Sequence, residues 1–264
     1  MKVGFIGVGA MAKAIIRGMV RANLVPSADI LVHSAHKENY ETFATELSLT
    51  PVATNKQLAA DSDILVLAVV PGVVKQVITE IDGSISKETT VVSIVSGLSL
   101  SRIEELTSYN QPILRTLPNV NSAYGQGMTA VIANENLTGN SLKQALSIFE
   151  STGQTIELPE SQFANFSAIS GSAVAYVDFF IDALSRAGVK YGFTKEVATK
   201  IATQTTLGSA SSLLESGKSP AEVIDEVCSP GGDTIAGILA MEEKGFLPAV
   251  VHGIDATIKK STGN

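Results

Sequence analysis

The stretch "KVGFIGVGAMAKAI", Lys2 to Ile15, decides the fold of this 264-residue chain. A short aliphatic run leads into the pattern Gly7-x-Gly9-x-x-Ala12, and helical spacing follows at once. In a strand–turn–helix unit, the first glycine permits a tight turn and the second lets a pyrophosphate approach the backbone. A small third residue lets helix and strand pack closely. The same pattern also occurs in ordinary structural turns, so its meaning depends on the rest of the chain.

The first 160 residues alternate β-rich runs with helical segments. Strands are predicted at 2–8, 29–33, 63–69, 90–95, 112–116, 128–133 and 155–158, and helices at 10–22, 37–46, 72–80, 100–107 and 139–151. Several strands are almost continuously aliphatic, which is typical of parallel strands covered on both faces. The alternation predicts an α/β fold with a Rossmann-type doubly wound sheet in a domain of residues 1–160.

Residues 161–264 carry helical patterns only, and they predict an all-helical second domain. Helices are expected at 161–188, 195–216, 220–227, 234–244 and 247–260. The first is apolar nearly all round, so it is buried either within its own chain or against another subunit. The pattern leaves both open, but a helical half of this size buries little alone. We therefore expect a homodimer or a larger homo-oligomer.

Composition and charge exclude several classes of protein. The chain is 45% hydrophobic and 17% charged, which favours a folded protein over a disordered one. Its net charge of −7 argues against general binding to nucleic acid or anionic membranes. The longest apolar run, 64–74, is too short to span a bilayer, and no secretory leader is recognised. The single cysteine, Cys228, fits a reducing, cytoplasmic compartment.

The segment "HSAHK", residues 33–37, follows the second strand and bears on the choice of coenzyme. An NAD enzyme places an acidic residue there to bind the ribose 2′-hydroxyl. In this chain no acid occurs before Glu38, whereas Ser34, His36 and Lys37 offer groups that suit a 2′-phosphate. The segment predicts NADPH in preference to NADH. The alternative is a polar strand end that happens to lack acids and binds no phosphate.

Two more strand ends, "AVVPG" (68–72) and "IVSG" (94–97), lie where ligands bind to such sheets. Pro71 cannot extend the strand, so the chain must turn there. Both segments are compatible with simple strand stops, but their position favours contact with a cofactor.

The segment "SPGGDT", Ser229 to Thr234, opens a predicted helix and is the candidate substrate loop. Asp233 or Thr234 is the expected N-cap. The amides of Gly231, Gly232, Asp233 and Thr234 are expected to converge on one small anion, such as a substrate carboxylate. A capping loop without a ligand is the alternative.

The longer stretch "VCSPGGDTIAGILAMEE", residues 227–243, resembles the signature of the pyrroline-5-carboxylate reductases, the enzymes of the last step of proline synthesis. "GFIGVGAMAKAI" (4–15), "SAISGSAVAYVDFFIDAL" (167–184) and "GSASSLLESGKSPAEV" (208–223) are similar to further segments of that family. The segments occur in the family's order over essentially the whole chain.

This resemblance implies a Rossmann domain, a helical domain that interleaves with a dimer mate, and NAD(P)H-dependent reduction of 1-pyrroline-5-carboxylate to L-proline. It places a carboxylate substrate on the loop, with Thr234 at the ring nitrogen. The implied substrate residues are Ser229, Gly231, Gly232, Asp233 and Thr234. With His36 and Lys37 added from the strand end, the cofactor residues are Ile6, Gly7, Val8, Gly9, Ala10, Met11, Ser34, Asn55, Ala68, Val69, Val70, Pro71, Ile94, Val95 and Ser96.

Three segments depart from the family pattern. Val70 stands where a lysine is usual, Val120-Asn121 replaces Thr-Pro, and Val174 replaces proline. A divergent reductase of a related imine or 3-hydroxyacid, or a non-catalytic NADPH-binding protein, therefore remains an alternative. Hydroxyacid dehydrogenases of this plan use a lysine on the long helix, and 163–185 contains none.

Histidine, cysteine, arginine and aromatic side chains at several positions have mainly structural interpretations. The three histidines lack metal-ligand spacing, and no metal is expected. Cys228 is expected to be a small buried filler. Arg115 is predicted to bind either a phosphate or a local carboxylate, and Tyr176 and Phe180 to pack in the core.

Overall fold

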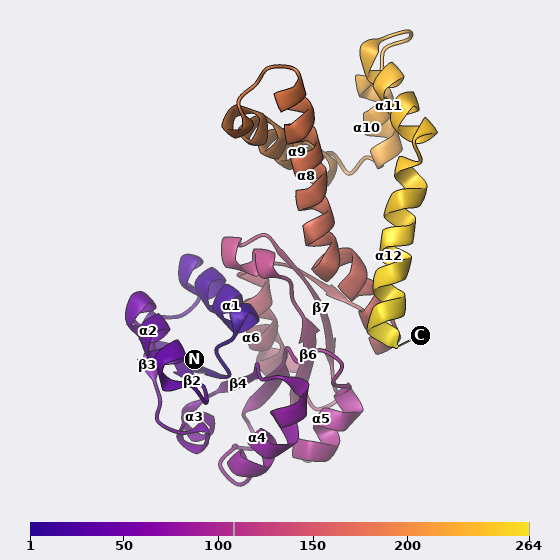
Figure 1. The fold of residues 1–264 in the computed structure, drawn as a ribbon. Helices are drawn as coiled ribbons and strands as arrows, with labels where there is room; N and C mark the ends of the chain where they lie inside the picture. Colours follow the sequence, from indigo (N-terminus) through magenta and orange to yellow (C-terminus); the bar gives the residue numbers. More distant parts are fainter. Residues whose placement is uncertain (108, 264) are drawn as a thin grey trace. The chain divides into compact units, whose positions relative to one another are not determined.

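The computed structural model describes residues 1–107 and 109–263, so Ser108 and the last residue of the expected second domain, Asn264, lie outside it. Packing divides the chain into Met1–Gly171 and Ser172–Asn264. The division after Gly171 lies later in the chain than the domain boundary expected at residue 160. The boundary at residue 160 remains a prediction. Figure 1 shows the elements of both units.

The first unit contains an eight-stranded sheet in the order β3-β2-β1-β4-β5-β6-β7-β8. Neighbours from β3 to β6 are parallel, whereas β7 is antiparallel to β6 and parallel to β8. This order and direction confirm the predicted doubly wound sheet. The strands are β1 (Val3–Ile6), β2 (Ile30–His33), β3 (Thr50–Pro51), β4 (Ile64–Leu67), β5 (Thr90–Ser93), β6 (Ile113–Leu117), β7 (Gly127–Ala133) and β8 (Gly153–Glu157).

Helices cover both faces of the sheet (Figure 1). One core joins the strands to α1 (Ala10–Arg21), α2 (Lys37–Leu47) and α6 (Gly139–Glu150), and the other joins them to α3 (Asn55–Asp61), α4 (Val74–Ile81) and α5 (Leu100–Thr107). In β4, Ile64 and Val66 belong to the first core, while Leu65 and Leu67 belong to the second. Burial on both faces explains why these strands are aliphatic at every position.

The long helix expected at 161–188 is interrupted, and that expectation is wrong in this respect. A 3₁₀ turn at Glu160–Gln162 leads into α7 (Phe163–Phe166), a π-helical turn at Ser167–Ser172 and then α8 (Ala173–Lys190). The carbonyl of Ser170, inside the π turn, accepts a hydrogen bond from the side chain of Asn119. A side chain bonded to a helix carbonyl is a known cause of such irregularity.

The second unit consists of α8, α9 (Lys195–Ser216), α10 (Pro220–Val227), α11 (Asp233–Glu243) and α12 (Phe246–Thr262). The hydroxyl of Tyr176 on α8 bonds to Thr257 and, at 3.3 Å, to the carbonyl of Gly253 on α12. Among the described residues of this unit, the fully buried apolar side chains are only Ala198 and Ala202. Alone, therefore, this unit has almost no hydrophobic core.

The helical run Glu160–Lys190 is long and apolar enough to cross a membrane by length and composition. Its mean hydropathy over the most apolar window is 1.3, and 6% of that window is buried. The run 64–74, expected to be the longest continuous apolar run, lies outside this stretch, whose apolar residues are interrupted by polar ones. A helix that packs against another subunit is as apolar as a membrane-spanning helix, and it is equally exposed when one chain is taken alone.

Candidate functional site

The turn after β1 requires glycine at position 7. Gly7 has a φ of +97°, in the region that favours glycine. A Cβ at this position would lie 2.5 Å from the carbonyl oxygen of Ala68. The amide of Gly7 donates to the carbonyl of His33 at 2.8 Å. The turn is thus fixed against the ends of β2 and β4.

Gly9 differs from Gly7 because nothing in the fold requires it. Gly9 is the N-cap of α1, its φ of −78° is ordinary, and no side chain caps the helix. Apart from its neighbours along the chain, a Cβ on Gly9 would meet no atom of the described residues within 4 Å. The space above Gly9 and the unpaired amides of the first helical turn fit the pyrophosphate of a dinucleotide. These residues therefore suit the cofactor that the sequence predicts.

A hollow of about 420 Å³ at the end of β2 is lined in part by Ser34 and Lys37. Glu41 lines the same hollow and pairs with Lys37 at 3.3 Å. The sequence argument missed this acid because Glu41 lies one helical turn beyond Lys37. His36 is exposed as the N-cap of α2. Of the residues predicted to bind the cofactor, the hollow therefore offers the Ser34 hydroxyl and the Lys37 ammonium, and Glu41 partly neutralises the ammonium.

The predicted contacts at the ends of β4 and β5 divide into exposed and buried groups. Val70 is 67% exposed, and Pro71 starts a short 3₁₀ turn beside it. Ile94 and Val95 are buried in the two cores, so only their backbone is available at this edge. Ser96 is exposed. A ligand here meets backbone, the exposed Val70 side chain and the Ser96 hydroxyl.

Asn55 carries a buried polar atom that lacks a partner. It is the first residue of α3, and its Nδ2 donates to Glu80 at 2.9 Å. Its Oδ1 is buried and accepts no hydrogen bond within the described residues. A ribose hydroxyl is the kind of donor that would satisfy this acceptor. The unsatisfied Oδ1 atom therefore fits the predicted role of Asn55 in cofactor binding.

The substrate loop opens α11, but its amides are not all free. The N-cap is Gly232, not Asp233 or Thr234 as expected, because the helix begins one residue earlier than predicted. The amide of Gly232 donates to the carbonyl of Ser229 at 3.0 Å. The amide of Thr234 donates to Oδ1 of Asp233 at 2.9 Å. An anion therefore finds the amides of Gly231 and Asp233 directly, and that of Thr234 only by displacing a carboxylate.

The hydroxyl of Thr234 is available to a ligand. Thr234 is exposed, and its hydroxyl has no partner in the described part of the chain.

The preceding helix, α10, begins with a capping box formed by Ser219 and Glu222. The hydrogen bonds that Glu222 accepts from Ser219 hold the pKa of the Glu222 carboxyl below its usual value. Cys228 is the C-cap of α10 and is only half-buried, so the expectation of a small buried filler is wrong.

Arg115 binds a local carboxylate rather than a free phosphate. It is 8% exposed and pairs with Glu160. The Glu160 carboxylate also accepts the amide of Leu100 at 2.6 Å. The guanidinium lies 4.4 Å from the centre of the Phe163 ring. This cluster fixes the start of the segment that leads into α8.

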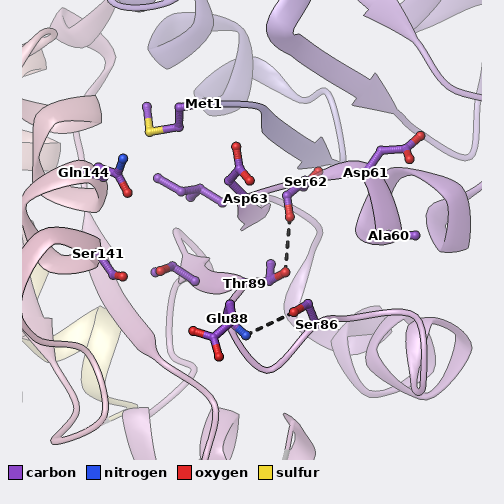
Figure 2. A pocket seen from close by; sticks show the side chains of 12 residues that line it. Met1, Ala60, Asp61, Ser62, Asp63, Ser86, Glu88, Thr89, Ser141 and Gln144 are labelled. Atoms are coloured by element: carbon purple, nitrogen blue, oxygen red, sulfur yellow. Dashed lines mark hydrogen bonds between the residues drawn. The ribbon is translucent and has the colours of Figure 1, made fainter.

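Another hollow, also about 420 Å³, lies at the opposite, N-terminal edge of the sheet (Figure 2). Met1, Asp63, Glu88 and Gln144 are among its lining residues. Asp63 accepts the amide of Lys2 at 2.7 Å. None of the predicted site residues lines this hollow, so it is separate from the cofactor edge.

The two units together define a class of protein: a Rossmann-type nucleotide fold followed by a helical unit with exposed apolar faces. Within residues 1–107 and 109–263, no three His, Cys, Asp or Glu side chains gather closely enough to hold a metal ion. A family model described as "NADP oxidoreductase coenzyme F420-dependent" matches residues 2–97. A second, described as "Pyrroline-5-carboxylate reductase dimerisation", matches residues 160–263.

Known proteins then identify the family. The chain is 34% identical to the pyrroline-5-carboxylate reductase of Escherichia coli over 98% of this chain and 97% of that protein. A crystal structure of the Streptococcus pyogenes 1-pyrroline-5-carboxylate reductase matches with a TM-score of 0.86 and 34% identity, covering 100% of this chain and 99% of that one. The Plasmodium falciparum enzyme with NADP bound matches at 0.87 and 30%, covering 100% and 97%. The chain belongs to the pyrroline-5-carboxylate reductase family, and its dimerisation domain indicates self-association.

Proposed function

We propose that this protein reduces 1-pyrroline-5-carboxylate to L-proline with NADPH. The observation that carries the proposal is the loop Ser229 to Thr234, in which unpaired amides and the free hydroxyl of Thr234 stand at one helix N-terminus. A carboxylate and a ring nitrogen on neighbouring atoms match those groups. The names of the relatives, including a structural neighbour with NADP bound, support the same substrate and coenzyme.

Reduction of a C=N bond needs a hydride at carbon and a proton at nitrogen. When bound, the nicotinamide supplies the hydride. The first turn of α1 binds the pyrophosphate, while the amides of Gly231 and Asp233 orient the substrate carboxylate. The Thr234 hydroxyl contacts the ring nitrogen. Because an imine is basic enough to arrive protonated from water, the chain need not provide an acid, and its main contribution is orientation.

The coenzyme preference is tested by Ser34→Asp. We expect the variant to lose about tenfold or more in NADPH affinity, because a carboxylate next to the 2′-phosphate is repelled. NADH affinity should change little. The control is Ser86→Asp at the opposite edge of the sheet, where the new carboxylate can still accept the Glu88 amide that Ser86 accepts now. Titration of both coenzymes measures the effect, and equal catalytic efficiency with NADH and NADPH in the unmodified protein would contradict the preference.

We propose that the protein is an obligate homodimer or a dimer-based oligomer. Support comes from exposed apolar side chains of the helical unit, such as Phe179 at 75%, Leu214 at 84% and Leu247 at 70%. Burying each contributes about 1.5–3 kcal/mol. An apolar hollow of about 450 Å³ between α8 and α12 adds unfilled surface.

Light scattering of the full chain is expected to give at least twice the mass of one chain across the micromolar range. Dilution should cause loss of helical circular dichroism together with dissociation, because the separated helical unit lacks a core. A folded monomer at micromolar concentration would refute the obligate dimer.

We also propose a cytoplasmic location. The one cysteine of the chain is free, and a protein whose thiol stays reduced suits that compartment. Cell fractionation checks the proposal and also tests the apolar run Glu160–Lys190. Recovery with the membrane fraction would contradict it.

A further inference from the structure

The hollow at the end of β2 contains a carboxylate beside the ammonium that is expected to bind the 2′-phosphate. Of the described residues that line it, Lys37 is the only lysine or arginine, and Glu41 is the only aspartate or glutamate. The two form an ion pair at 3.3 Å across one turn of α2. The side chains are 73% and 45% exposed, so a ligand can reach both. The positive charge that suits a phosphate is therefore already in contact with a negative one.

The place of Glu41 at this hollow is fixed by its neighbour in the chain. Tyr40 is buried in the core that joins the strands to α1, α2 and α6. The centre of its ring lies 5.3 Å from that of His33, at the end of β2. Nδ1 of His33 lies 2.9 Å from the carbonyl oxygen of Val52. These contacts hold the first turns of α2 against the strand end, and Glu41 remains at the hollow as a result.

Lys37 stands where a cation needs a nearby anion. It is the first residue of α2, whose N-cap, His36, makes no side-chain cap hydrogen bond. The N-terminal end of a helix has unpaired amides and a partial positive charge, so it disfavours a cation and favours an anion. In the protein Glu41 supplies that anion. A bound 2′-phosphate would supply it as well, and the two anions would repel each other.

We propose that Glu41 limits the preference for NADPH over NADH, because it competes with the 2′-phosphate for the Lys37 ammonium. The inference rests on the proposed use of NADPH. NADH has a hydroxyl in place of the phosphate, so it can bind with the ion pair intact. NADPH has to weaken the pair and bring a phosphate towards a carboxylate. Glu41 is thus a specificity-determining residue whose effect falls on one coenzyme.

The test is Glu41→Gln in the full-length protein, with coenzyme binding measured by titration. Glutamine has the same length and a similar helix propensity, so α2 should keep its structure. We expect the NADPH dissociation constant to fall about threefold or more, and that of NADH to change little. The titrations are done at low ionic strength, where exposed charges are least screened. Adenosine 2′,5′-bisphosphate should bind more tightly to the variant, whereas ADP, which lacks the 2′-phosphate, should not.

Glu46→Gln is the matched control. Glu46 lies on the same helix and pairs with Arg17 at 2.7 Å, but it does not line the hollow. Each variant removes one carboxylate and one ion pair from α2. A general effect of net charge on coenzyme binding would therefore appear in both. Only Glu41→Gln should raise the ratio of the NADH dissociation constant to that of NADPH.

Lys37→Gln tests whether Glu41 acts through the lysine. This variant alone should weaken NADPH binding and leave NADH binding nearly unchanged. When Glu41→Gln is added to it, the gain in NADPH affinity should be much smaller than in the unmodified background, because no ammonium remains to compete for. A pair of residues that act together shows this kind of non-additivity in a double-mutant cycle.

The inference is overturned if Glu41→Gln leaves both dissociation constants unchanged, lowers both by the same factor, or changes only that of NADH. An equal gain in the Lys37→Gln background would also overturn it, because the carboxylate would then act on the coenzyme without the lysine. None of these titrations needs the substrate. A protein that binds NADPH but reduces nothing would therefore refute the proposed reaction and not this inference.

Discussion

Thr234→Ala is expected to lower kcat for 1-pyrroline-5-carboxylate about ten- to a hundredfold, which corresponds to about 1–3 kcal/mol of lost transition-state stabilisation. The hydroxyl has no partner among the described residues, so its removal breaks no hydrogen bond seen there. The amide of residue 234 still donates to Asp233, and the loop keeps its conformation. The cost is therefore assigned to the lost contact with the ring nitrogen.

Steady-state kinetics measure this effect, and the NADPH dissociation constant is determined for the same variants. The matched control is Thr234→Ser, which keeps the hydroxyl and should recover most of the rate. NADPH affinity should stay the same in both variants. Full activity of Thr234→Ala would remove the residue from the mechanism, and lost NADPH binding would show that the loop serves the cofactor.

Gly9→Val is expected to reduce NADPH affinity by about a hundredfold, because the new side chain fills the space that the pyrophosphate needs and prevents its hydrogen bonds to α1. Stability should fall by only about 1 kcal/mol, the cost of a poorer N-cap. Apart from its neighbours along the chain, no atom of the described residues lies within 4 Å of the added Cβ. A large loss of binding with a small loss of stability would mark Gly9 as functional.

Gly7→Ala is the contrasting variant. The φ of +97° and the 2.5 Å approach to the Ala68 carbonyl make any side chain at position 7 a strain on the turn itself. Its main expected effect is a lower melting temperature. If Gly9→Val bound NADPH normally, the turn would have no role in coenzyme binding.

The fold was predictable because its signals are local. Buried strands appear as aliphatic runs, and α9 and α10 begin and end at the predicted residues. Thr194 and Ser219 accept amides of the first turn in these helices and mark their starts. The edge strand β3 was missed because it has two residues and one is Pro51, which reads as a strand stop.

Candidate site residues could be proposed from the sequence only where their groups are contiguous. The glycine turn and the loop Ser229 to Thr234 are single segments, so their residues could be named in advance. The partner of Arg115 lies 45 residues away at Glu160, and no local pattern links them. Likewise the bond between Asp233 and the Thr234 amide depends on a side-chain rotamer, which spacing does not determine.

The most direct measurement is the absorbance of NADPH when the purified protein is mixed with NADPH and 1-pyrroline-5-carboxylate. We predict that the nicotinamide band disappears with turnover, that one proline forms for each NADPH consumed, and that Thr234→Ala slows both. NADPH binding without any turnover would contradict the account and would instead favour a non-catalytic NADPH-binding protein.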